Sequence, residues 1–108
     1  MASILGKFTK TDVERKQYTV DYSNWLGDNE VLTGVQCLID LTNPDEVTDT
    51  TPLIVEAAVL SSDLGACTII VDDGTIDAVY VVTLLATTTI TQLKEDGLQI
   101  TITPGVIE

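Results

Sequence analysis

Hydrophobic and polar residues alternate along much of the chain with the period of two that is typical of β-strands. Segment 33–41 shows the pattern most clearly. Every second residue from Val35 to Leu41 is apolar, while Gln36 and Asp40 lie on the opposite face. We therefore predict a half-buried strand here, with one face on the core and the other toward solvent.

A longer β-run covers residues 77–88, and both of its faces are largely apolar. Strands that are apolar on both faces lie in the middle of a sheet, so we predict a central strand here. Further strands are predicted at 18–22, 53–60, 66–71 and 98–103. Residues 56–58 favour a helix, so one short helical turn is an alternative here. The segment between the proline and the next turn is so short that it fits a strand better.

Residues that favour turns separate the predicted strands. A polar loop is expected at 48–51. Turns are predicted at Asn43–Asp45, Ser61–Gly65, Asp72–Thr75, where Asp-Asp-Gly is a hairpin signal, and Glu95–Gly97. About six or seven strands, separated by turns every 8 to 15 residues or so, predict an all-β fold: an immunoglobulin-like β-sandwich of antiparallel strands.

The composition supports this fold class. Thr, Val and Ile provide 39 of the 108 residues, and these β-branched side chains suit strands better than helices. A hydrophobic fraction of 44% is too high for a disordered acidic tail. The length allows one domain with a core of its own.

The charges are unevenly distributed. The net charge is −12, yet residues 1–16 hold four of the five cations and only two of the 17 acids. We predict an extended basic arm over residues 1–16 and a sandwich domain over residues 17–108. The arm is expected to dock on an acidic surface of a neighbouring copy or partner, and a solvated tail is the alternative. The expected contact residues are Ile4, Lys7, Phe8, Lys10, Arg15 and Lys16.

Several function classes are disfavoured by the residues present. Histidine is absent and no serine has a GxSxG context, so we expect no enzyme activity and no cofactor. An acidic body repels phosphates, which argues against nucleic-acid binding. No apolar run approaches the roughly 20 residues that span a bilayer, and no secretory signal is present, so we expect no membrane partner and cytosolic synthesis.

No metal site is expected either. Asp72, Asp73 and Asp77 lie close to Gly74, but their spacing does not match an EF-type calcium loop, and a turn is favoured. The acids of segment 45–49 are expected to form a solvated loop without defined geometry.

Four residues are assigned to the structural core. Cys37 and Cys67 suit neither a zinc knuckle nor a CxxC pair, and reduced thiols are favoured over a disulfide. Trp25 is assigned to the core, with an interface anchor as the alternative. Tyr80 lies in segment 77–82, which looks like the tyrosine corner of immunoglobulin-like domains, where the hydroxyl bonds to nearby backbone.

Two segments, 21–33 and 80–89, resemble a family of small virion proteins of tailed phages that includes fibre-tail adaptor-like proteins. The first has the family's tyrosine, its Ser-x-Trp-Leu sequence and a following acid. The second has the Tyr-x-Val strand and Ala-Thr-Thr, with acids before the last strand in Lys94-Glu95-Asp96. The likeness extends over much of residues 18–103. It departs from the family pattern at 74–77, where a glycine-rich approach is reduced, and at 90–92, where a glycine is missing.

The resemblance implies a non-enzymatic structural protein of the bacteriophage virion, a multicopy adaptor that joins tail and fibre or neighbouring subunits. It implies other virion proteins as partners, a homo-oligomer in the particle, and assembly in the bacterial host cytoplasm. It supplies no catalytic residues. The alternatives are a capsid decoration (cement) protein, a carbohydrate- or receptor-binding module, which the aromatic content of 5% disfavours, and an acidic inhibitor that mimics nucleic acid.

Overall fold

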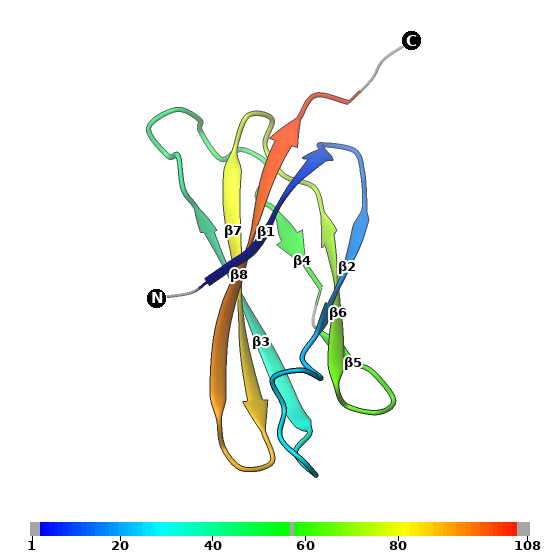
Figure 1. The fold of residues 1–108 in the computed structure, drawn as a ribbon. Helices are drawn as coiled ribbons and strands as arrows, with labels where there is room; N and C mark the ends of the chain where they lie inside the picture. Colours follow the sequence, from blue (N-terminus) through cyan, green and yellow to red (C-terminus); the bar gives the residue numbers. More distant parts are fainter. Residues whose placement is uncertain (1–2, 57, 106–108) are drawn as a thin grey trace.

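The computed structural model describes residues 3–56 and 58–105, and over these ranges it contains strands and no helix. Eight strands form two sheets that pack face to face as a β-sandwich, shown in Figure 1. The predicted all-β sandwich is therefore confirmed. Eight strands replace the six or seven that we expected, because residues 3–11 also form a strand and segment 53–60 forms two.

The first sheet has the strand order β1-β8-β7-β3. Its members are β1 (Ser3–Thr11), β8 (Leu93–Thr103), β7 (Val79–Thr88) and β3 (Leu32–Leu41). β7 lies between two partners, which confirms the central strand predicted at 77–88. β1 pairs with β8 in parallel, whereas the other strand pairs in the described part of the chain are antiparallel.

The second sheet is built around β6 (Ala66–Asp72), which pairs with β2 (Lys16–Asp21), β4 (Ile54–Val55) and β5 (Val59–Leu60). The strand predicted at 53–60 is thus two short strands. Val55 pairs with Val71 and Val59 with Thr68, so this side of the ladder holds one residue more than the β6 side. An extra residue interrupts the pairing as a β-bulge does.

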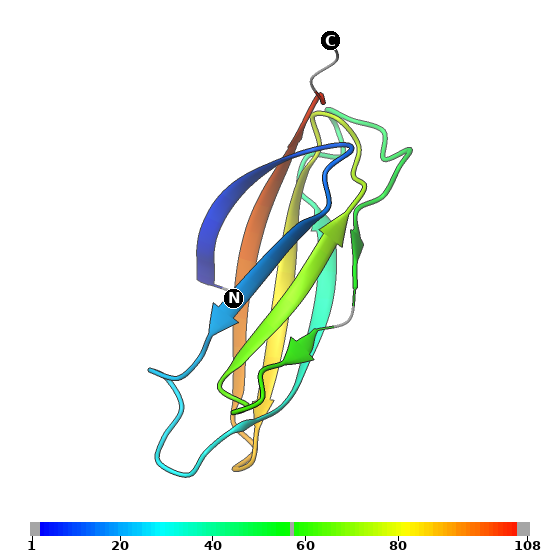
Figure 2. The same cartoon turned by 90° about the vertical axis from the view of Figure 1, so that its right-hand side faces the viewer.

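The core lies between the two layers, which Figure 2 shows with β2 and β6 in front of β7 and β8. Every second residue of β7 from Tyr80 to Thr88 is buried, as alternation in a strand requires. Three of them, Tyr80, Val82 and Leu84, form one core cluster with buried aliphatic residues of β6 and β8, namely Ile69, Val71, Leu98, Ile100 and Ile102.

The turn predicted at Glu95–Gly97 is wrong. β8 runs through these residues, and the turn between β7 and β8 lies at 89–92, where the amide of Thr91 donates to the carbonyl oxygen of Thr88. Asp96 points inward opposite Leu84 and is only 1% exposed. Acid-acid-glycine predicts a turn when its side chains reach solvent, and here one of them is buried.

The hairpin predicted at Asp72–Thr75 is also wrong, because β6 and β7 belong to different sheets. The chain does turn here. Asp73, Gly74 and Asp77 have φ values of 57°, 111° and 70°, the left-handed conformations that Asp and Gly tolerate. The turn residues were recognised, but they carry the chain across the sandwich instead of back along the same sheet.

Candidate interaction surfaces

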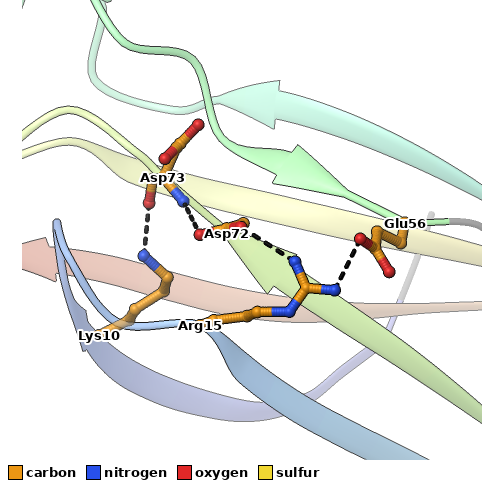
Figure 3. A network of polar contacts seen from close by, with 5 residues as sticks. All are labelled: Lys10, Arg15, Glu56, Asp72 and Asp73. Carbon is orange, nitrogen blue, oxygen red and sulfur yellow. Dashed lines mark hydrogen bonds and ion pairs between the residues drawn. The ribbon is translucent and has the colours of Figure 1, made fainter.

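Arg15 lies in the turn between β1 and β2 and joins it to the second sheet, as Figure 3 shows. Its Nη2 lies 2.7 Å from Oε1 of Glu56 and its Nη1 lies 3.0 Å from Oδ2 of Asp72. These hydrogen bonds, with the charges of the two acids, raise the pKa of Arg15. Nζ of Lys16, the first residue of β2, lies 3.5 Å from Oε2 of Glu14 in the same turn. The contacts fasten the turn to the sandwich while leaving it open to solvent.

Lys10 occupies an inward position of β1 and is fully buried. Its Nζ donates to the carbonyl oxygens of Thr11 and Asp73, at 2.7 and 2.5 Å, and Figure 3 shows the second of these bonds. Burial lowers the pKa of Lys10, and the charges of Asp72 and other nearby acids oppose that shift. The ammonium group therefore ties β1 to the loop between β6 and β7.

The remaining residues assigned to the arm lie on or beside β1. Phe8 lies on the same face of β1 as Lys10 and is 37% exposed, and its ring centroid lies 4.8 Å from that of Tyr18 on β2, so the pair bridges the two sheets. Lys7 is exposed on the opposite side of β1. The side chain of Ile4 lies outside the described part of the structure. Docking of this segment on another subunit stays a prediction.

Tyr80 connects three segments at one end of the sandwich. Its hydroxyl donates to Oδ1 of Asp49 at 2.6 Å and accepts from the amide of Thr75 at 3.0 Å. The bond to Thr75 is the backbone contact that the tyrosine-corner interpretation predicts. Desolvation raises the pKa of Tyr80, and the bond to Asp49 adds to the shift. Solvation was expected for Asp49, and this was wrong, because Thr75 Oγ1 also donates to it at 2.9 Å.

Loop 22–31 lies at the opposite end. Tyr22 is buried, and its ring meets that of Trp25 edge-on with 6.2 Å between the centroids. Trp25 is half-buried, and Nζ of Lys94 lies 5.6 Å from its ring centroid, within cation–π distance. Lys94 also lies 3.7 Å from Oδ1 of Asp96. Trp25 thus packs against the core on one side and faces a cation on another.

Turns at this same end carry exposed apolar side chains, as does the turn between β1 and β2 at the other end, where Val13 is 78% exposed. Ile90 and Leu93 are 59% and 71% exposed in and beside the turn between β7 and β8, and Leu64 is exposed between β5 and β6. The amide of Leu32 donates to the carbonyl oxygen of Leu64, which ties that turn to the end of loop 22–31. Exposed apolar groups on a mostly acidic protein are candidates for protein contacts.

The cysteines are free thiols, as predicted. Cys67 is 1% exposed and Cys37 is half-buried. Burial raises the pKa of both thiols.

The three acidic residues considered for calcium binding form hydrogen bonds with neighbouring protein groups. The amide of Asp73 donates to Oδ1 of Asp72, and the carbonyl oxygen of Asp77 accepts from the side-chain amide of Asn43. Within residues 3–56 and 58–105, no group of three or more metal-ligating side chains comes together.

A hollow of about 240 Å³ lies near this loop, lined by Asp12, Thr50, Thr51, Gly74, Thr75 and Ile76. The described residues also contain no helix that could cross a membrane.

The sequence did not reveal the anchoring roles of Lys10, which was assigned to docking, and of Asp49, which was assigned to a solvated loop. The signal for Lys10 was its spacing of two from Phe8, which puts both on one face of a strand. No local signal marks Asp49, because its partner Tyr80 is 31 positions away.

A family model described as "Podophage GP4 fiber-tail adaptor protein gp77" matches residues 10–101. The matched range runs from the end of β1 into β8 and includes both segments that carry the resemblance noted in the sequence. None of the curated proteins matches the chain.

Proposed function

Since the chain belongs to the podophage GP4 fiber-tail adaptor family, we propose that it is a non-enzymatic, multicopy structural protein that joins tail and fibre in the virion. The family match over residues 10–101 is the observation that carries this proposal. Its partners would be tail and fibre proteins and further copies of itself, with neither nucleic acid nor membrane among them. Assembly would take place in the cytoplasm of the bacterial host.

The shape of the sandwich supports a bridging role. The molecule measures 50 × 29 × 18 Å, and its loops lie at the two ends of the long axis in Figure 1. One end carries the Tyr80–Asp49 contacts and the ion pairs of Arg15. The other carries exposed Ile90 and Leu93 beside half-buried Trp25. An adaptor needs two different contact surfaces on one rigid body, and we assign one to each end.

We also propose that the sandwich is immunoglobulin-like. Two features support this assignment. β3, β7 and β8 share one sheet and β2, β6 and β4 the other, which matches the partition of strands C, F, G and B, E, D in that fold. The hydroxyl of Tyr80 accepts from the amide of Thr75 at the start of β7, where the fold places its tyrosine corner.

The test is to produce phage particles without this chain and examine them by electron microscopy. We expect tails without fibres, and we expect the purified protein, added back, to restore fibre attachment. A matched variant, Ile90→Asp with Leu93→Asp, should fold but restore attachment poorly, because it places charges on the apolar end. Gln17→Asp, an exposed change on β2, is the control and should restore attachment fully.

Two results would replace the proposal. Particles with fibres in place but fragile capsids would identify a decoration protein. Particles with intact fibres and capsids that fail to adsorb to the host would identify a carbohydrate- or receptor-binding module.

A further inference from the structure

The outer face of the first sheet is the side of β1, β8, β7 and β3 that points away from the core. Its residues alternate with the buried ones along each strand, and all of them are exposed or half-buried. Most are Val, Leu, Thr and Gln. The set comprises Lys7, Thr9, Gln36, Leu38, Asp40, Val79, Val81, Thr83, Leu85, Glu95, Gln99 and Thr101.

This face carries few charges for a molecule of net charge −12. Its charged residues are Lys7, Asp40 and Glu95, while most other acids of the described chain lie in the loops. Copies of an acidic protein repel one another, so self-association is favoured through a surface where acids are scarce. The outer face meets this condition, and Leu38 on it is 45% exposed.

Lys7 stands apart from the other cations. The other four cations, Lys10, Arg15, Lys16 and Lys94, each have an intramolecular ion pair or hydrogen bond. Within the described part of the chain, the ion pairs and hydrogen bonds include none to the side chain of Lys7 or to that of Asp40. One free cation and one free anion are therefore available on the same face.

Strand register places these two residues in one row across the sheet. Lys7 is the partner of Gln99, Gln99 of Val81, and Val81 of Asp40. β1 and β3 are the two edges of the sheet. The Cα atoms of Lys7 and Asp40 are thus separated by three strand spacings, about 14 Å.

We propose that two copies of this chain pack through their outer faces about a two-fold axis parallel to the strands. Such an axis places β1 of each copy opposite β3 of the other. It keeps each residue at the same position along the strands, so the row of one copy lies opposite the row of the other, with the order of its four residues reversed. Lys7 of each copy then faces Asp40 of the other, and the ion pair forms twice, as an isologous interface requires. Between the pairs, Val81 faces Gln99.

The available area fits a weak, specific dimer. The ten-residue length of β7 and the width of the four strands, β7 included, give a face of about 33 by 19 Å. Two such faces bury about 1,200 Å² together, the lower end of the range for specific protein interfaces. Twisted sheets that pack face to face align within about 30°, so the rows can meet along most of the contact.

The experiment measures the mass of the purified chain by light scattering from micromolar to millimolar concentration. We expect the wild type to approach twice the chain mass of 11.6 kDa. Lys7→Glu and Asp40→Lys should each weaken the dimer about tenfold, since like charges then face each other at both symmetric contacts. The exchanged variant, Lys7→Glu with Asp40→Lys, should dimerise like the wild type.

Two charge reversals away from the outer face serve as matched controls. Lys16→Glu in β2 and Asp28→Lys in loop 22–31 should leave the dimer unchanged. Circular dichroism establishes that each variant keeps its β-structure. A wild type that stays monomeric, a larger closed oligomer, or an exchanged variant that fails to recover would each overturn the proposal.

This inference rests on the multicopy part of the proposed function and adds the contact surface and symmetry. Its failure is distinguishable from failure of the adaptor role. A monomeric chain that still restores fibres to deficient particles overturns the dimer alone, whereas a dimeric chain with no effect on fibres overturns the adaptor alone.

Discussion

The hydroxyl of Tyr80 lies 2.6 Å from Oδ1 of Asp49, a residue 31 positions earlier in the chain. Tyr80 begins the buried face of the central strand, whereas Asp49 belongs to the long loop between β3 and β4. The same carboxylate oxygen accepts from Thr75 in the loop that precedes β7. One buried hydroxyl thereby holds two loops against the end of the sandwich.

Tyr80→Phe should lower the free energy of unfolding by about 1 to 3 kcal/mol, because it removes a hydrogen bond to a charged group and leaves the amide of Thr75 without its acceptor. Urea unfolding followed by circular dichroism measures the loss. Tyr18→Phe is the control, since no hydrogen bond to its hydroxyl is found among the described residues. Equal effects of the two changes would contradict the role assigned to the Tyr80 hydroxyl.

Gly74→Ala should destabilise the protein by about 1 to 3 kcal/mol. Gly74 has a φ of 111°, and a Cβ there would lie 2.8 Å from side-chain atoms of Ile102. Gly34→Ala is the matched control, because its Cβ would meet Thr87 Oγ1 at an ordinary 3.6 Å. Thermal unfolding of the two variants should separate them clearly, and a neutral Gly74→Ala would show that the loop relaxes to accept a side chain.

Arg15→Gln should cause a small fall in stability that shrinks as salt is added. The guanidinium group pairs with Glu56 and Asp72, but the side chain is half exposed and ions screen such pairs. The measurement is the midpoint of urea unfolding at low and at high sodium chloride. A loss that does not depend on salt would point to packing of the aliphatic stem instead.

Stability should fall in acid partly through Asp63. Hydrogen bonds from Ser61 Oγ and the amide of Gly65 hold the pKa of Asp63 below its ordinary value of 3.8. A lowered folded pKa gives a contribution that is fully present above the unfolded value and is lost as the pH falls through the folded one. Ser61→Ala removes one donor, so an NMR titration should show the carboxyl pKa rising toward its ordinary value. An unchanged titration would refute the assigned cause.

The two thiols should react slowly with a disulfide reagent at mildly alkaline pH. Burial raises the pKa of both, which lowers the thiolate fraction, and Cys67 is the more enclosed of the two. Cys67→Ala and Cys37→Ala identify which thiol accounts for each rate, and Cys37 should be the faster. Urea should make both accessible at once. Recovery of a disulfide-linked monomer from the native protein would contradict the free thiols.

The alternation of apolar and polar residues was enough to predict the sandwich. Side chains of a strand point to its two faces in turn, so residues such as Val35 and Leu84 have to recur at every second position to reach the core. The pattern also located the central strand, whose two apolar faces are visible in the sequence. Alternation does not encode which strands become partners. Asp-Asp-Gly at 72–74 therefore predicted a turn correctly, but the hairpin predicted from it was wrong. The strands on either side of this turn, β6 and β7, do not pair, since β7 pairs with β8 and β3 in the other sheet.

The charged residues were harder to place. Lys10 was treated as a docking residue because of its charge, yet two carbonyl oxygens stabilise its ammonium group inside the protein. Asp96 was placed in a turn for the same reason and is buried beside Lys94. Composition indicates that a segment is basic or acidic, whereas the partner of each charge is set by contacts between distant segments. Lys7 and Asp40 illustrate this, because only the register of four strands puts them in one row.

The parallel pairing of β1 with β8 determines when the chain can finish folding during its synthesis. The carbonyl oxygen of Lys10 accepts a hydrogen bond from Thr103, 93 residues later. β1 therefore stays unpaired until β8 has been synthesised, and Phe8 and the backbone groups of β1 are exposed in the meantime. Chains that stop before residue 93 lack β8 and should consequently be substrates for chaperones and proteases.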